Sequence, residues 1–451
     1  MRRWSNDKNS WKYMFRYRSC VCSLEPMGVS FKWFSEIAPF PSQVLKEKFP
    51  KVPNLGDMNN IPDMLKLGKI EAPDLLCGGT PCQAFSFAGN QKGLDDERGN
   101  LTLKFVDIIK ANDSVRKKEG KEESIVFWEN VEGVLSDKTN AFGCLVSSLA
   151  GLDQVYSLDK WPTAGLIEGK KRNVAWRVLD AKYFGLPQQR RRLYVLAGGK
   201  HFHPENILFE QDTNHLDNQP EYPLCGIKEG VEFEIFRQYS DCLYSAYGTK
   251  WNGNAAAYNG SLFVVQDGRI RRLSPLECER LMGFPDNYTD IKGASRTNRY
   301  QAIGNSWAVP VVRWIGNRLI NNQGEPIELR KYKKDLAVEI GKKLWFYDLR
   351  DGKLPVTKDR VINTSSIPNE CNYCSLLDIV SKDAPKSIYI SPVGCRGIVG
   401  RKEERKININ ERLEEVLLKI ADEMDEEEIE KRSRIQKRGK YSPPMKETII
   451  V

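Results

Sequence analysis

One cysteine stands where a thiol could act as a nucleophile. Residues 74–93 read DLLCGGTPCQAFSFAGNQKG, in which a short apolar run ends in two glycines and is followed by Pro81 and Cys82. Most free cysteines are buried and fill space in a core. Reactive side chains, in contrast, are concentrated on loops that a rigid scaffold holds in place. The local sequence alone therefore admits both a buried thiol and a nucleophile on the loop that leaves a strand.

Strand-like and helix-like segments alternate between residues 29 and 200. Strands are predicted in SFKWFSEI, APDLLCGG, SIVFWENV, NVAWRVLDAKYFG and RRLYVLAGG, and helices in PFPSQVLKEKFP, NLTLKFVDIIKAN and FGCLVSSLAGL. This alternation predicts an α/β fold with a doubly wound, mostly parallel sheet. Ligands of such sheets bind beyond the carboxyl ends of the strands. Since Asp57, Cys82 and Glu129 each follow a strand-like run, we expect them to converge on one crevice.

Length, charge and cysteine content limit the class of protein. The 451 residues exceed one ordinary domain, and 40% apolar residues without a long apolar run indicate a globular protein with neither a membrane span nor a signal peptide. The net charge of +9 favours an anionic partner. The odd number of cysteines, 11, argues against a disulfide framework and for a reducing, cytoplasmic compartment.

Five stretches occur together in the order of one known family. They are GGTPCQAFS (78–86), WENVEGVL (128–135), FGLPQQRRRLYV (184–195), RRLSPLECERLMGFP (271–285) and RYQAIGNSWAVPVV (299–312). Through them residues 24–320 resemble the DNA (cytosine-5)-methyltransferases of bacteria and phages. The resemblance implies a class I S-adenosylmethionine-dependent methyltransferase of Rossmann-like fold that methylates carbon 5 of cytosine.

The chemistry of that reaction explains the residue types. Carbon 5 of cytosine is a poor nucleophile, so the ring has to be activated by a thiolate that adds to carbon 6. The resemblance assigns this thiolate to Cys82. It places Glu129, as a carboxyl group with a raised pKa, at ring nitrogen 3 and Arg192 at the carbonyl oxygen of the base, with Arg190 supporting the loop.

The same resemblance implies contacts with a base that leaves the stack. The loop after Cys82 is similar to the loop that closes over DNA in this family. Substrate contacts are expected from Gln83, Ser86, Asn130, Val131 and Gln188. In the segment 245–260, rich in aromatic residues, glycine and asparagine, Lys250 is a candidate for a groove contact, with an ordinary turn-rich loop as an equal alternative.

The implied methyl donor is S-adenosylmethionine, and no metal is expected. An acidic residue at a strand end commonly binds ribose hydroxyls, and Glu36 has that position. The remaining cofactor contacts are expected from Asp57 and Met58 at the adenine, from Asn305 and Val309 on the methionine side, and from Pro81.

The first cofactor contact of the family has no counterpart here. Family members have a glycine-rich turn about twenty residues before the acidic residue, and glycine lets the backbone approach the cofactor. Gly28, assigned to a helix-to-strand turn, is the only glycine before Gly56, and residues 21–23 are predicted to end the first strand. Two interpretations stay open. One is a degenerate homologue that binds DNA with impaired cofactor binding; the other is an enzyme in which residues 11–20 supply a different strand and turn.

Changes in composition and pattern divide the chain into four regions, and the family resemblance implies their roles. Residues 1–198 are predicted to form the catalytic core, 199–270 a small target-recognition region, 271–320 the C-terminal part of the core, and 321–451 a charged, partly helical extension. Within this extension, the acidic and then basic run at 411–440 predicts a solvated helix.

Partners and alternatives complete the expectations. We expect double-stranded DNA as the partner, and a cognate restriction endonuclease is a possible second one. The protein is expected to be a monomer in the cytoplasm of a bacterial or phage-infected cell. Cys371 and Cys374 have metal-ligand spacing, but only Cys395 is near, which favours plain cysteines. A nucleotide-fold dehydrogenase is disfavoured because no G-x-G-x-x-G occurs.

Overall fold

The computed structural model describes most of the chain and divides it into two compact units. The described residues are 12–15, 18–79, 100–212, 219–249, 255–321, 326–350, 352–357 and 360–425. The first unit comprises residues up to 223, 238–251 and 274–381, and the second comprises 224–237, 252–273 and 382 onward. Five predicted site residues lie outside the described residues: Pro81, Cys82, Gln83, Ser86 and Lys250.

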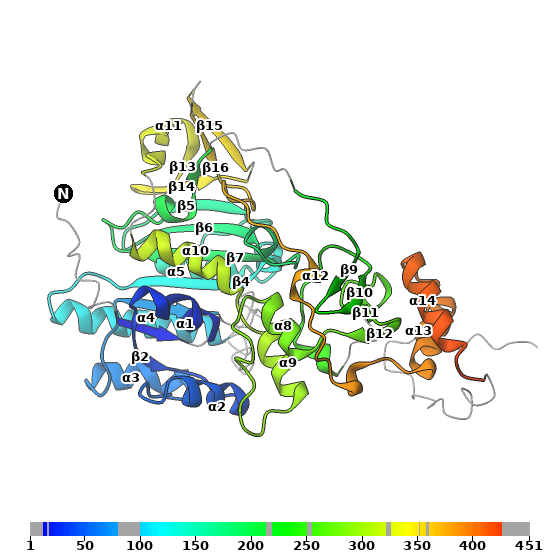
Figure 1. Ribbon diagram of the computed structural model, residues 1–451. Coiled ribbons are helices and arrows are strands. Elements are labelled where there is room, and N and C mark those ends of the chain that lie inside the picture. Colours follow the sequence, from blue (N-terminus) through cyan, green and yellow to red (C-terminus); the bar gives the residue numbers. More distant parts are fainter. Residues whose placement is uncertain are drawn as a thin grey trace, which may run out of the picture. The chain divides into compact units, whose positions relative to one another are not determined.

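A nine-stranded sheet forms the centre of the first unit (Figure 1). Its parallel half consists, from the edge inward, of β2 (Ser30–Phe34), β1 (Lys12–Phe15), β3 (Leu75–Gly78) and β4 (Ile125–Val131). The antiparallel half continues with β7 (Arg191–Gly198), β6 (Asn173–Asp180), β5 (Ala164–Glu168), β14 (Leu344–Asp348) and β13 (Ala337–Gly341). The α/β class is confirmed, and the parallel half contains the strands that precede the predicted site.

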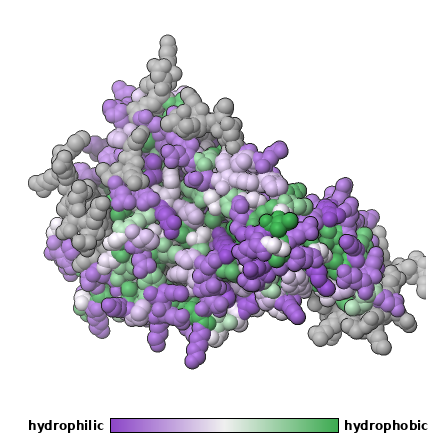
Figure 2. Space-filling model, viewed as in Figure 1, coloured by the Kyte–Doolittle hydropathy of each residue, from purple (hydrophilic) through white to green (hydrophobic). Residues whose placement is uncertain are grey.

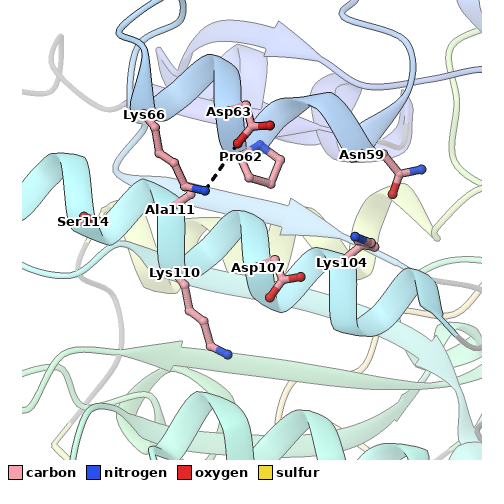
Figure 3. A pocket seen from close by; sticks show the side chains of 9 residues that line it. All are labelled: Asn59, Pro62, Asp63, Lys66, Lys104, Asp107, Lys110, Ala111 and Ser114. Atoms are coloured by element: carbon pink, nitrogen blue, oxygen red, sulfur yellow. Dashed lines mark hydrogen bonds and ion pairs between the residues drawn. The ribbon is translucent and has the colours of Figure 1, made fainter. Parts of the chain in front are cut away.

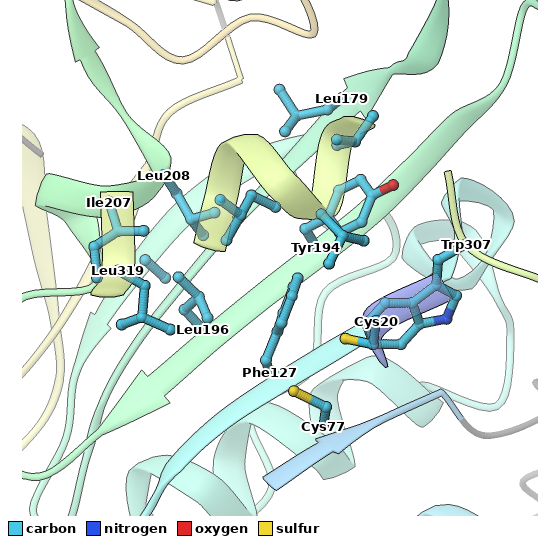
Figure 4. Packing of buried hydrophobic residues seen from close by; sticks show 14 of the residues in the cluster. Cys20, Cys77, Phe127, Leu179, Tyr194, Leu196, Ile207, Leu208, Trp307 and Leu319 are labelled. Carbon is cyan, nitrogen blue, oxygen red and sulfur yellow. The ribbon is translucent and has the colours of Figure 1, made fainter. Parts of the chain in front are cut away.

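Alternation along the strands gives the sheet two apolar faces. In β4, Ile125 and Phe127 belong to one hydrophobic cluster, and Val126 and Trp128 to the other, because successive side chains of a strand point to opposite faces. Both faces are covered by helices, which is why the strands read as continuous apolar runs. Figure 4 shows the first cluster, where Phe127 lies among side chains from several elements.

Helices from distant parts of the sequence cover these faces. On the first lie α1 (Arg18–Leu24) and α10 (Val309–Ile320), and on the second α3 (Ile61–Lys66), α4 (Asn100–Lys118) and α5 (Ala141–Ala150). The other α-helices of the first unit are α2 (Pro39–Lys48), α6 (Glu205–Leu208), α8 (Pro275–Leu281), α9 (Arg296–Gly304), α11 (Lys333–Leu336) and α12 (Leu376–Ile379).

The N-terminal segment differs from the sequence-based prediction. Residues 21–23, predicted to end a strand, lie inside helix α1. The strand is β1, which pairs in parallel with β2 on one side and β3 on the other. The four residues of β1 are too few for a clear period, so the sequence offered a strand within residues 11–20 only as one of two open interpretations. Gly28 does lie at the predicted helix-to-strand turn, with φ of +79°.

Much of the region 326–381 is part of the first unit. Strands β13 and β14 extend the central sheet, and β15 (Lys353–Thr357) and β16 (Arg360–Asn363) join β8 (Glu210–Gln211) in a small sheet. The buried Arg177 fixes this region, since its guanidinium donates to Glu210 at 2.9 Å and to the carbonyl oxygen of Ser365 at 2.6 Å.

The second unit is a four-stranded antiparallel sheet with helices. Its strand order is β12 (Arg269–Arg272), β11 (Phe263–Gln266), β10 (Val231–Ile235) and β9 (Cys225–Lys228), and its helices are α7 (Ala255–Tyr258), α13 (Pro392–Arg405) and α14 (Glu411–Ala421). The backbone amide of Ile390 donates to Ile270 of β12 at 3.0 Å. Residues 382–425 thus fold with the sheet although they lie more than 100 positions further along the chain.

Helix α14 corrects one expectation. The run from residue 411 was predicted to be solvated, yet Leu413, Val416, Leu417 and Ile420 are buried. These residues recur at helical spacing, so the charged residues between them occupy only the opposite face. The prediction was wrong because it considered the number of charged residues in this segment and not the helical spacing of the apolar residues between them.

The described surface carries no membrane-spanning element. No helix among the described residues is long and apolar enough to cross a membrane. On the face drawn in Figure 2, hydrophilic side chains predominate and apolar ones are interspersed.

Candidate active site

Glu129 lies near the end of β4, on the face of the first hydrophobic cluster. It follows Ile125 and Phe127 at a spacing of two, so its side chain points to the same side of the sheet. The residue is only 8% exposed. Burial raises the pKa of its carboxyl group, and the positive charges of Arg192 and Arg190 offset this in part. The net direction is upward, so Glu129 holds a proton more readily than an exposed glutamate.

Arg192 reaches Glu129 from the neighbouring antiparallel strand. In the register of β4 and β7, Val131 lies opposite Arg192 and Glu129 opposite Tyr194. Arg192 and Tyr194 are two positions apart, which brings both side chains to the face of Glu129. The Nε atom of Arg192 lies 3.4 Å from Oε1 of Glu129.

Arg190 is buried and bonded to the backbone of two other segments. Its guanidinium donates to the carbonyl oxygens of Leu243 at 3.1 Å, Gly304 at 3.2 Å and Ser306 at 2.7 Å. The side chain thereby joins the start of β7 to the segment before η5 (Ser245–Gly248) and to the end of α9. Arg191, in contrast, is exposed and pairs with Glu132 at 2.7 Å.

The other predicted substrate residues near β4 have different surroundings. Gln188 is fully buried, donating to Leu281 at 3.0 Å and accepting from the amide of Leu243 at 2.8 Å. Asn130 is 7% exposed and its Oδ1 atom accepts from the amide of Val131, whose side chain is 44% exposed.

Glu36 and Asp57 are the second group of predicted site residues, and Glu36 follows β2 at the carboxyl ends of the parallel strands. A parallel bridge from Phe34 to Asn54 places the segment before Asp57 beside that strand. Asn54 connects the two, because its side chain accepts from the amide of Glu36 and donates to its carbonyl oxygen, each at 2.9 Å. Asp57 is exposed and caps η2 (Met58–Asn60) by accepting from Asn59 at 2.9 Å.

The remaining predicted cofactor residues are mostly buried. Met58 belongs to the second hydrophobic cluster with 7% exposure, and Val309 at the start of α10 has none. The carbonyl oxygen of Val309 accepts from Ser23 of α1 at 3.0 Å. Asn305 is exposed at the end of α9.

Two residues of the site were not singled out in the sequence. Ile37, directly after Glu36, is 68% exposed, which is unusual for so large an apolar side chain beside an acidic group. Cys242 lies against the guanidinium groups of Arg190 and Arg192. The position of Ile37 after a strand-end acid could have identified it, whereas Cys242 is 50 positions from Arg192 and has no local signal.

A surface cavity of about 390 Å³ lies between the segment after Asp57 and helix α4 (Figure 3). Its lining carries both signs of charge, from Asp63, Lys66, Lys104, Asp107 and Lys110. Lys66 and Asp63 pair with each other at 3.4 Å. Because its charges are mixed, the cavity has no evident preference for an anion or a cation.

Comparison with known proteins gives one family and several relatives. The sequence pattern of the family described as "C-5 cytosine-specific DNA methylase" matches residues 20–260 and 231–321. The "DNA N-6-adenine-methyltransferase" of Escherichia phage P1 is 31% identical, with 71% of this chain and 62% of that protein covered. The "Type II methyltransferase M.HhaI" of Haemophilus parahaemolyticus is 28% identical, with 69% of this chain and 92% of that protein covered. The chain thus spans less than two thirds of the first relative and most of the second. Among solved structures, the S. pombe Dnmt2 methyltransferase covers 69% of this chain and 99% of its own, at 15% identity and a TM-score of 0.45.

Proposed function

The chain belongs to the family of C-5 cytosine-specific DNA methylases, and we propose that it methylates carbon 5 of a cytosine flipped out of double-stranded DNA. The observation that carries this proposal is the pair formed by Glu129, near the end of β4, and Arg192, at the start of β7. Glu129 is buried with a raised pKa, and Arg192 lies 3.4 Å from it. In the sequence, Cys82 follows β3, the strand that pairs with β4.

In the proposed reaction each residue acts on one atom of the base. The Cys82 thiolate adds to carbon 6, and protonated Glu129 donates to nitrogen 3, which would otherwise gather negative charge. Arg192 donates to the carbonyl oxygen. Carbon 5 then takes the methyl group from the sulfonium, which leaves as a neutral thioether, and gives up its hydrogen to water as a proton. Nitrogen 3 returns its proton to the Glu129 carboxylate, and the bond between carbon 6 and sulfur breaks to release the thiolate.

The residues around Glu36 fit S-adenosylmethionine, which as a sulfonium supplies the methyl group. Glu36 and Asp57 present two carboxylates at neighbouring strand ends, suited to ribose hydroxyls and to the adenine amine. Exposed Ile37, directly after Glu36, offers an apolar surface for the flat adenine. We assign Met58 and Val309 to holding the backbone of η2 and α10 in place, and Asn305 to a polar contact on the methionine side.

The N-terminal segment supports an active enzyme over a degenerate one. Strand β1 fills the place between β2 and β3, which in a doubly wound sheet lies next to the cofactor. Residues 12–15 thus supply the strand that the second interpretation expected within residues 11–20. No glycine stands in the sequence between β1 and α1, and this is the remaining difference.

The name of the first relative specifies a different base, adenine. The exocyclic amine of adenine has its own lone pair and needs no covalent activation of the ring. A buried carboxyl group with a raised pKa beside an arginine fits the activation of cytosine instead. The product is therefore expected to be 5-methylcytosine and not N6-methyladenine.

The proposed partners follow from the substrate. Double-stranded DNA is the proposed partner, and residues 199–270 are proposed to read its sequence. Of these residues, 224–237 and 255–270 belong to the second unit, whereas Glu129, Arg190 and Arg192 belong to the first. A monomer and a cognate endonuclease stay predictions.

Covalent trapping tests the proposal. Random-sequence duplexes containing 5-fluorocytosine are incubated with the protein and S-adenosylmethionine, and the mixture is run on a denaturing gel. Fluorine cannot leave as a cation, so the adduct persists, and it should require both the cofactor and Cys82. Cys82→Ser is the control. Mass spectrometry of hydrolysed unmodified DNA identifies the methylated base.

The outcomes separate the alternatives. A cofactor-dependent adduct together with 5-methylcytosine supports the proposal. DNA binding without an adduct on any sequence contradicts it and favours the degenerate homologue. N6-methyladenine as the product contradicts the assignment of the base.

A further inference from the structure

The sulfur atom of Cys242 lies between two guanidinium groups of the candidate active site. Arg190 donates to it through Nη1 at 3.1 Å, and Arg192 through Nη2 at 3.3 Å. A neutral thiol is a weak acceptor, so two donors directed at one neutral sulfur would gain little. A thiolate accepts both bonds strongly, because the bonds are then charge-assisted.

The charges around this sulfur are unbalanced without an anion. Arg190 is 3% exposed, and burial and the neighbouring Arg192 lower its pKa. Glu129 faces Arg192, but the proposed reaction requires its carboxyl group to be protonated. The buried guanidinium of Arg190 and the half-buried one of Arg192 would then repel each other with no other negative charge acting on them from the described residues, which is a costly arrangement.

We propose that Cys242 is a positioning residue whose thiolate is the counter-ion of Arg190 and Arg192, which holds Arg192 at the base and leaves Glu129 free to stay protonated. The inference deepens the proposed function and rests on it. It adds no step to the reaction, since the Cys242 sulfur acts through the arginines and forms no bond to the base.

The other groups near this thiol agree with that assignment. Burial alone would raise the pKa of the thiol, but the two arginines outweigh it and lower the pKa below that of a free cysteine. Glu129 on β4 lies beyond Arg192. The phenol of Tyr194 on β7 has a pKa raised by burial and so remains neutral. Asp241 precedes the thiol in the chain.

Three substitutions separate a counter-ion from a packing residue. Cys242→Ser keeps size and polarity without the charge, Cys242→Ala removes both, and Cys242→Asp restores an anion. For a counter-ion, kcat falls roughly tenfold or more in the Ser and Ala variants, with KM for S-adenosylmethionine unchanged, and recovers at least in part in the Asp variant. The high-pH limb of the kcat profile also moves to lower pH in the Ser variant, because Glu129 then becomes the anion that the arginines stabilise.

A different order of activities would overturn the inference. If serine supports full activity and aspartate does not, the sulfur only fills space. If all three variants lose activity equally, without a change in the pH profile, the residue is structural.

A measurement without catalysis keeps the inference separate from the proposed function. The folded protein is treated with iodoacetamide over a range of pH, and the labelling of each cysteine peptide is followed by mass spectrometry. Cys225 is the internal control, since it is exposed and its pKa is raised by burial and by acidic neighbours. The pH at which the labelling rate is half of its maximum, called the midpoint, is expected to be lower for Cys242 than for Cys225.

The two proposals therefore fail in different ways. A Cys242 midpoint at or above that of Cys225, or labelling only after unfolding, overturns the counter-ion whatever the activity. A low Cys242 midpoint in a protein that forms no adduct with 5-fluorocytosine leaves the counter-ion standing and contradicts the methyltransferase.

Discussion

Near the end of β4, burial raises the pKa of the Glu129 carboxyl group, and Arg192 and Arg190 lower it. Burial prevails, so the pKa of Glu129 lies above its ordinary value of 4.5. Glu132, three positions on, has the opposite balance, because its ion pair with Arg191 at 2.7 Å lowers its pKa. The same residue type thus has two environments, a buried carboxyl group with a raised pKa and a surface carboxylate in an ion pair.

Substituting Glu129 by glutamine should separate activity from stability. Because the folded pKa is raised, the stabilising effect of the protonated form is complete below pH 4.5 and is lost as the pH rises through the folded pKa. Glutamine stays neutral throughout. The free energy of unfolding of Glu129→Gln, relative to the unmodified protein, should therefore rise between about pH 4 and pH 7, while methyl transfer falls by about 10²- to 10⁴-fold.

Glu132→Gln is the matched control for this prediction. Its pair with Arg191 is partly exposed and should contribute less than about 1 kcal/mol, present at neutral pH and lost as the pH falls. Urea unfolding at several pH values measures both variants. A Glu129→Gln protein that is less stable at pH 7 than at pH 4, relative to the unmodified chain, would contradict the raised pKa.

At the scale of elements, local patterns predicted the parts of the sheet that have a clear period. Strands β2, β3, β4, β6 and β7 and helices α2, α4 and α5 were all predicted from apolar runs or helical spacing. Strands β13 and β14 were missed because β14 joins the sheet by pairing with β5, about 180 positions earlier in the chain, and β13 joins it only through β14. Similarly, the contact of Cys242 with Arg192 depends on a fold that only distant pairings determine.

Close packing between α9 and the segment before η5 explains a glycine in this part of the site. A Cβ atom on Gly304 would lie 2.7 Å from the backbone nitrogen of Ser245 and 2.7 Å from the carbonyl carbon of Tyr244. Backbone atoms cannot yield as a flexible side chain can. The carbonyl oxygen of Gly304 also accepts from Arg190 at 3.2 Å, so any displacement would reach the arginine.

Gly304→Ala should therefore cost stability and activity together. Overpacking of this kind costs about 1–3 kcal/mol, and the shifted Arg190 should lower kcat as well. Gly133→Ala is the control, because nothing lies within 4 Å of its Cβ position, and its stability should change by less than about 0.5 kcal/mol. Thermal unfolding and methyl transfer measure both effects. Equal stability of the two variants would show that the segment before η5 can move away without cost.

At the scale of the whole molecule, chain order and spatial order differ most in the second unit. Its sheet comes from residues 225–272, whereas α13 and α14 come from the end of the described chain. Two of the interactions hold α14 to the earlier residues. The amide of Asn410, which caps α14, donates to the carbonyl oxygen of Tyr258 in α7 at 2.9 Å, and Arg412 pairs with Glu234 of β10 at 2.6 Å. A segment that the sequence presents as an extension is thus half of the core of this unit.

Truncation after residue 381 should consequently unfold the second unit and leave the first. Removing α13 and α14 exposes the apolar face of the sheet, and a lone four-stranded sheet with one bare face is not expected to hold its structure. Hydrogen exchange followed by mass spectrometry should show fast exchange in peptides from 224–237 and 255–273, with protection of β4 and β7 retained. Binding of S-adenosylmethionine should persist, because Glu36 and Asp57 belong to the first unit, while DNA binding weakens.

Truncation after residue 425 is the control, since it keeps both helices and should preserve protection in 224–237. If that peptide stays protected after truncation at 381 as well, the sheet is stable alone and the two segments are independent.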